Sequence, residues 1–176
     1  DAIAPRYRAL VVFDAYCGLR LGELAGLRRS RLDLPGHRVR VAEIAVEVQG
    51  RMTIGAPKTR AGQRTVPVPR FVAEAMRRHL SEYCDNQPDS LVFGGADGGI
   101  LRANAWRSRH WCPAIRAAGL EPLRPHDLRH SSNIAHYQFR RGGEPEPDRR
   151  LGGPHLGGGS TGSLRPLVSG PRDRGS

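Results

Sequence analysis

The chain changes character after Arg141, and this change limits how much of it can fold around an apolar core. Residues 142–176 contain ten Gly and five Pro but only four Leu and one Val. Such a segment has too few apolar side chains to bury, and its composition favours disorder. We therefore expect one folded domain over residues 1–141, a length suited to a single core, followed by a Gly/Pro/Arg-rich tail over residues 142–176.

The apolar pattern of residues 1–141 predicts a mainly helical α+β domain. Helices are expected over residues 5–17, 71–83 and 104–118, in a short stretch after Gly18, and from Pro125 to Ile134. Gly18 should end the first helix, and Pro113 should kink the fourth. Alternating apolar residues over 39–48, with strands over 53–56 and 64–68, predict a small antiparallel sheet with a hairpin turn at 49–51. Residues 30–34 are expected to form a loop.

The charge of the chain favours a polyanionic partner such as nucleic acid. There are 28 basic and 17 acidic residues, and the formal net charge is +11. All but one of the basic residues are arginine, which together with the Gly, Ala and Pro content indicates a GC-rich genome. Because codon usage alone can explain the excess of arginine, the single lysine, Lys58, is more informative than any one arginine.

Cysteine spacing and hydropathy narrow the class of protein further. Cys17, Cys84 and Cys112 are odd in number and widely spaced, which argues against a disulfide framework or a zinc module. No apolar run approaches the roughly 20 residues that a transmembrane helix needs, and no leader sequence opens the chain. We expect a soluble cytoplasmic protein without membrane association.

Three separated segments supply groups suited to binding a phosphodiester: Gly18–Leu24, Pro57–Arg60 and His126–His130. Phosphoryl transfer through a five-coordinate phosphorus requires its nonbridging oxygens to be neutralised. Planar guanidinium groups do this with paired hydrogen bonds. We predict that Arg20 and Arg129 are these clamps.

The same segments offer proton donors and a supporting carboxylate. Lys58 is predicted to protonate the leaving 5′-hydroxyl, provided that cationic neighbours lower its pKa. His126 lies three residues before Arg129, on nearly the same helix face, and could bind the same phosphate and assist proton transfer. Glu23, one turn after Arg20, is predicted to hold the arginine's guanidinium in place.

Each segment alone also has a plain structural explanation. Arg20 and Glu23 could be an exposed pair at a helix start, Lys58 a solvated turn lysine, and His126 a residue of a first helical turn. Their combination, in this order and with a sheet between the first and the last, favours phosphate chemistry.

Over about residues 5–131 the chain resembles the catalytic domain of the tyrosine recombinases, the phage integrase family. Residues 18–24 are similar to the family's first arginine box, residues 57–64 to its lysine-bearing hairpin, and residues 123–131 to its second box. The resemblance implies a mainly helical domain with a small three-stranded antiparallel sheet. It also implies site-specific recombination of double-stranded DNA through a covalent 3′-phosphotyrosine link, by synaptic tetramers, with no metal or other cofactor.

The sequence departs from the family pattern after the second box. The family carries a Leu-Gly-His segment and then its nucleophilic tyrosine about 30 to 35 residues after the second-box arginine, whereas this chain has no tyrosine after Tyr137. Tyr137 is only eight residues past Arg129 and is not assigned as nucleophile, because that helix would hold it rigidly and bury it. The family's amino-terminal DNA-clamping domain is also not found in the chain.

These departures predict a partial catalytic domain over residues 1–141 that is inactive because it has no identified nucleophile. A non-catalytic DNA-binding remnant is the alternative interpretation. A metal site at His126 and His130, with His110, Cys112 or Asp127 nearby, is a weaker one. It is weaker because Arg129, which lies between the two histidines, would repel a metal ion.

The tail is compatible with a family C-terminus translated in a shifted reading frame. If residues 151–157 are encoded by CTG GGC GGG CCA CAC CTC GGT, dropping the first nucleotide gives Trp-Ala-Gly-His-Thr-Ser, similar to the family's histidine segment. If residues 164–167 are encoded by CTA CGG CCA CTT, the same shift places a tyrosine at position 164, which is 35 residues after Arg129. Both the missing motif and its spacing would then return.

Overall fold

The computed structural model describes residues 2–57, 59 and 62–128. Its helices are α1 Pro5–Cys17, α2 Leu21–Ala25, α3 Arg70–Tyr83, α4 Ala103–Trp106 and α5 Cys112–Ala117. Single 3₁₀ turns form at Arg29–Arg31 and Pro125–Asp127, and a π-helical turn forms at Arg107–Trp111. The strands are β1 Leu32–Asp33, β2 Arg38–Val41, β3 Ile44–Val48, β4 Arg51–Gly55 and β5 Arg64–Pro67. None of the helices in these ranges is long and apolar enough to cross a membrane.

The strands form two antiparallel sheets where the sequence predicts one. One sheet has the order β1-β2-β5, and the other is the β3-β4 hairpin. The chain leaves the first sheet after Val41, and Glu43, between the two sheets in sequence, accepts a hydrogen bond from Arg28 Nε at 3.3 Å. The hairpin turn predicted at 49–51 is confirmed, with Gln49 and Gly50 in the left-handed region at φ 49° and 75°.

The loop predicted over residues 30–34 is wrong. Its second half is β1, in which Leu32 pairs with Val39 and Asp33 with Arg38. The Asp33 carboxylate holds the turn that follows, accepting the Gly36 N–H at 2.8 Å and Arg38 Nε at 2.7 Å. This short strand therefore depends on its partner and on one side chain, and carries no alternating pattern of its own.

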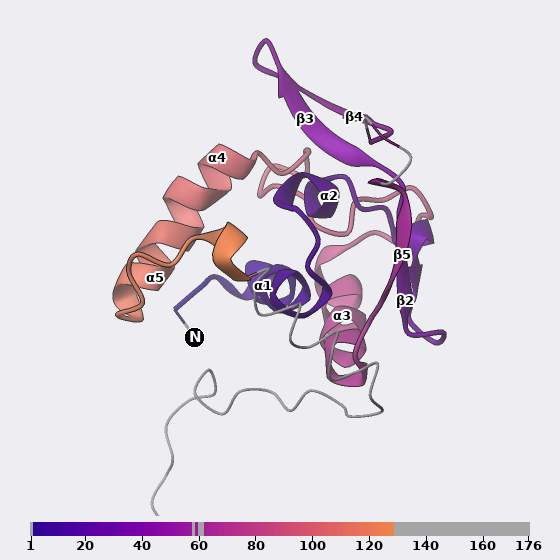
Figure 1. Cartoon of the computed structure of the whole chain (residues 1–176), viewed down its shortest axis with the longest axis horizontal. Helices are drawn as coiled ribbons and strands as arrows, with labels where there is room; N and C mark the ends of the chain where they lie inside the picture. Colours follow the sequence, from indigo (N-terminus) through magenta and orange to yellow (C-terminus); the bar gives the residue numbers. More distant parts are fainter. Residues whose placement is uncertain (1, 58, 60–61, 129–176) are drawn as a thin grey trace, which may run out of the picture. The chain divides into compact units, whose positions relative to one another are not determined.

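The core forms mainly between α1, α3 and the β1-β2-β5 sheet. Leu10 and Phe13 of α1 are fully buried, as are Val72 and Met76 of α3, and Figure 1 shows the two helices packed side by side. Gly18 ends α1 as predicted, with φ 64° and its N–H bonded to the Asp14 carbonyl at 2.9 Å. The position of this left-handed glycine fixes where α2 can begin.

Helix α2 packs so closely against β3 that only glycine fits at two positions along the contact. A Cβ at Gly22 would lie 2.9 Å from the Ala45 carbonyl oxygen, and a Cβ at Gly26 would lie 2.9 Å from the Ala45 nitrogen. Any side chain at either position would push helix and strand apart. The short helix that follows Arg20 therefore sits directly on the backbone of β3.

The helix predicted over residues 104–118 is continuous from Ala103 to Ala117 but contains a π-helical turn. The Cys112 N–H bonds to the Arg107 carbonyl, five residues back, just before Pro113. Such a turn is a recognised way to absorb an irregularity in a helix. Of the helix predicted from Pro125 to Ile134, only the first residues are described, beginning with a 3₁₀ turn that has Pro125 at its first position.

Candidate functional site

Two of the predicted site residues, Arg20 and His126, line the same open pocket of about 290 Å³. Its walls come from the α1–α2 turn, from the start of the α4–α5 helix and from the Pro125–Asp127 turn, which Figure 1 shows between them in orange. The lining residues are Asp14, Leu19, Arg20, Leu21, Ala103, Asn104, Arg107, Arg124, Pro125 and His126. Lys58 and Arg129 lie outside the described residues, as do the predicted domain boundary near Arg141 and the tail.

Arg20 is held at the backbone while its side chain stays accessible. It precedes the first residue of α2 in an extended conformation, next to the fully buried Leu19. Its side chain is 63% exposed and makes one long hydrogen bond, from Nη1 to Glu23 Oε1 at 3.3 Å. A guanidinium has five N–H donors, so most of the donors of Arg20 remain available to a ligand.

Glu23 braces the Arg20 turn mainly through groups other than the Arg20 guanidinium. Its side chain is only 4% exposed. Oε2 accepts the backbone N–H of Arg20 at 2.8 Å, and the two carboxylate oxygens accept Arg64 Nη1 and Nη2 at 2.8 and 2.9 Å. Glu23 was predicted to hold the Arg20 guanidinium, and this contact is present but is the longest of the four, at 3.3 Å.

The contacts of Glu23 set its charge state. Burial alone would raise the pKa of the Glu23 carboxyl, but the hydrogen bonds from Arg64 and from the Arg20 N–H, with the charges of both arginines, outweigh it and lower the pKa below its ordinary value. The hydrogen bond to Glu23 in turn raises the pKa of Arg64. Glu23 is therefore an anion at neutral pH.

The lowered pKa predicts a pH-dependent contribution to stability. Because the folded-state pKa lies below the ordinary value of 4.5, the stabilisation is complete above that value and is lost as the pH falls through the folded-state pKa. Glu23→Gln should lower the free energy of unfolding at pH 7 by about 1.5 to 3 kcal/mol, and its deficit relative to the native chain should shrink below about pH 4. Urea unfolding from pH 7 to pH 3 measures this, and a deficit that does not change with pH would contradict it.

His126 is positioned by a turn built like that of Arg20. The Asp127 carboxylate accepts the backbone N–H of Arg124 at 2.8 Å, as Glu23 does for Arg20 three residues before it. The turn is anchored to the neighbouring helix because Trp111 Nε1 donates to the Leu123 carbonyl at 3.1 Å. His126 is exposed at the pocket. In both boxes, then, an acidic residue fixes the backbone beside a phosphate-binding candidate.

Arg107 and Arg124 also line the pocket, and neither was among the predicted site residues. Arg107 is an exposed residue of the π-helical turn, and Arg124 precedes the Pro125–Asp127 turn. With Arg20 they give three guanidinium groups in one pocket, against the single buried carboxylate of Asp14. Guanidinium groups in such a number suit an oxyanion such as a phosphate.

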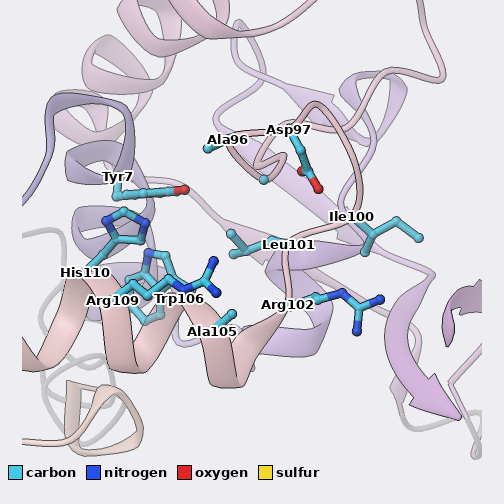
Figure 2. A pocket seen from close by; sticks show the side chains of 11 residues that line it. Tyr7, Ala96, Asp97, Ile100, Leu101, Arg102, Ala105, Trp106, Arg109 and His110 are labelled. Atoms are coloured by element: carbon cyan, nitrogen blue, oxygen red, sulfur yellow. The ribbon is translucent and has the colours of Figure 1, made fainter. Parts of the chain in front are cut away.

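A second pocket, of about 180 Å³, lies beside α1 and the helix that carries Arg107, and contains none of the residues predicted to bind the phosphate. Figure 2 shows the Tyr7 ring over His110 and next to Trp106, with ring centres 4.6 and 6.2 Å from Tyr7. Arg102 points away, toward Glu47 of β3, whose Oε1 accepts its Nη1 at 2.6 Å. The aromatic contacts join α1 to the helix that carries Arg107.

Metal binding has no support from the described part of the chain. Over residues 2–57, 59 and 62–128, no three His, Cys, Asp or Glu side chains gather closely enough to hold an ion. Because His130 lies outside these ranges, the metal-site alternative stays a hypothesis.

Known proteins resemble the chain over most of its length. The model of the phage integrase family matches residues 1–138. A putative prophage phiRv2 integrase of Mycobacterium tuberculosis is 34% identical over 134 residues, which are 76% of this chain and 36% of that protein. A tyrosine recombinase XerC of Azotobacter vinelandii is 34% identical over 132 residues, covering 74% of this chain and 39% of its own length. The chain thus spans little more than a third of these relatives.

Solved structures agree in fold. The Tn1549 transposon integrase in complex with circular intermediate DNA superposes with a TM-score of 0.66 at 22% identity, over 83% of this chain and 51% of that one. The XerA recombinase gives a TM-score of 0.59 at 22% identity, over 80% and 45% of the two chains. With the family match and the sequence relatives, the conclusion is that this chain belongs to the phage integrase family of tyrosine recombinases.

Proposed function

We propose that the chain is the phosphate-binding part of a site-specific DNA recombinase, which cuts and rejoins double-stranded DNA through a link between tyrosine and a 3′-phosphate. The observation that carries this proposal is the pocket in which Arg20 and His126, far apart in the sequence, lie together with Arg107 and Arg124. A relative of the same fold is solved with DNA bound. Action on DNA would place the protein in the cytoplasm.

Each group has a defined task in this proposal. Arg20 and Arg129 neutralise the nonbridging oxygens of the phosphate, and His126 donates a hydrogen bond to one of them. Lys58, from the loop between β4 and β5, gives a proton to the 5′-oxygen when the strand is cut. No step requires a metal ion or another cofactor.

The nucleophile is the missing element, because the chain has no tyrosine after Tyr137. We therefore propose that this chain binds DNA without cutting it, and that it does not assemble the family's tetramer, which uses the C-terminal segment for docking. A frameshift in the gene would account for the tail. The codon of Leu164 tests that point: CTA or TTA supports the frameshift, and any other leucine codon excludes it.

Binding and trapping assays test the proposed function. We expect salt-sensitive binding of duplex DNA, with log Kd rising linearly with log salt concentration by about 0.9 for each phosphate neutralised. On a nicked duplex that traps covalent intermediates, no protein–DNA adduct is expected. A trapped adduct would show that the chain retains a nucleophile. DNA binding that does not depend on salt concentration would show that the binding does not come from phosphate contacts in the pocket.

A further inference from the structure

Arg64 is the last residue of the lysine-bearing hairpin motif, but it was not predicted as a site residue and does not line the pocket. It is the first residue of β5, directly after the loop of residues 57–63 that carries Lys58, and its backbone pairs with Val41 of β2. Its guanidinium also lies 3.4 Å from the Gly62 carbonyl, at the end of that loop. The sheet therefore fixes the backbone of Arg64, while its side chain reaches a different part of the fold.

The partner that Arg64 reaches is the carboxylate of Glu23. Nη1 donates to Oε1 at 2.8 Å and Nη2 to Oε2 at 2.9 Å, a two-pronged arrangement between residues 41 apart in sequence. The single bond from Arg20 Nη1 to the same carboxylate is longer, at 3.3 Å. Paired bonds between a guanidinium and a carboxylate are the stronger kind, so Arg64 is the main counterion of Glu23.

Arg20 and Arg64 thus compete for the same carboxylate, and the competition matters because Glu23 is buried and charged. A buried carboxylate without a counterion attracts the nearest cation strongly. If Arg64 were absent, that cation would be the Arg20 guanidinium, which already touches Oε1 but remains 63% exposed. It would turn inward to Glu23 and leave the pocket.

We propose that Arg64 is a positioning residue of the phosphate site. It neutralises Glu23 so that the Arg20 guanidinium stays directed at the phosphate, and it ties the end of the Lys58 loop to the carboxylate that braces the Arg20 backbone. The inference rests on the proposed function, since it assigns Arg64 a role in binding the same phosphate. An ion pair that only stabilises the fold makes a different prediction: its loss would lower the free energy of unfolding but leave phosphate binding by the folded protein unchanged.

The test measures orthovanadate binding, by ⁵¹V line broadening, and duplex DNA binding for matched variants of the whole chain. Orthovanadate is a tetrahedral oxyanion that resembles phosphate in shape and charge. Arg64→Met, which keeps length without charge, should weaken vanadate binding about tenfold. Arg64→Lys keeps the charge but not the paired hydrogen bonds, so its vanadate binding should fall between those of the native chain and Arg64→Met. Adding Glu23→Gln to Arg64→Met should restore most of the lost affinity, because no anion then draws Arg20 inward.

The control is Arg38→Met, which removes a strand arginine paired to the exposed Asp33, away from the pocket. It should leave vanadate binding unchanged. If Arg64→Met unfolds, as monitored by circular dichroism, the double variant and Arg64→Lys carry the test. A double variant that folds but binds no better than Arg20→Ala would overturn the inference, as would unchanged binding by Arg64→Met.

The proposed function can fail separately from the inference. If Arg20→Ala weakens vanadate and DNA binding but the Arg64 variants do not, only the role of Arg64 is refuted. If the native chain binds neither probe, or Arg20→Ala changes nothing, the phosphate site itself is refuted and the inference with it.

Discussion

Replacing Arg20 by alanine is expected to weaken duplex DNA binding by about 10- to 100-fold, because one charged hydrogen-bonding partner of a phosphate is worth about 1.5 to 3 kcal/mol. The change should leave the fold intact. The Arg20 side chain is largely exposed, and the backbone N–H that Glu23 accepts is kept by alanine. Fluorescence anisotropy with a labelled random-sequence duplex at about 50 mM salt, where nonspecific binding is strong, measures the loss.

The salt dependence makes the expectation specific. Removing one phosphate contact should reduce the slope of log Kd against log salt by about one unit. Arg116→Ala is the matched control, because its exposed side chain pairs with Glu121 outside the pocket. Equal losses for the two variants would mean that DNA responds to total charge and not to the pocket.

Replacing Phe13 by alanine is expected to lower the free energy of unfolding by about 3 to 5 kcal/mol. Phe13 is fully buried in α1, and its ring centre lies 6.1 Å from that of Phe93. The change removes apolar contact area and leaves a cavity between α1 and the segment that contains Phe93. A loss of this size is a large share of the stability of a small domain, and urea unfolding monitored by circular dichroism measures it.

Val48→Ala gives the reference for this loss. Val48 is 55% exposed on the β3-β4 hairpin, so its truncation should change the free energy of unfolding by no more than about 0.5 kcal/mol. If Phe13→Ala were as mild as Val48→Ala, α1 could not be a central element of the core.

Elements with a strong pattern of their own could be predicted from the sequence. Helices α1 and α3 begin and end within a residue of the expected positions, because their apolar spacing and the glycine after Cys17 are local signals. Strand β1 could not be predicted because it is defined by its pairing with β2, and the division into two sheets depends on which strands pair across the fold. These contacts join residues whose proximity no local pattern reveals.

The residues of the candidate site likewise include some that could be predicted from the sequence and some that could not. The Arg20 turn and its Glu23 brace lie within one helical turn, so spacing alone could suggest them. Arg64 and Arg107 reach the site from elements distant in sequence. In a chain where nearly every basic residue is arginine, exposure and charge could not distinguish these two from the rest.

Two glycines, Gly22 in the first box and Gly26 directly after α2, give this region a role beyond that of its charged residues. At Gly22 and Gly26 the missing side chains let a helix lie against the backbone of β3, which sets how far Arg20 stands from the strands that lead to the Lys58 loop. Gly22 therefore acts as a spacer within the motif, because it sets the separation between α2 and β3. In any related chain, a larger residue at either position should signal a displaced arginine even where the arginine itself is kept.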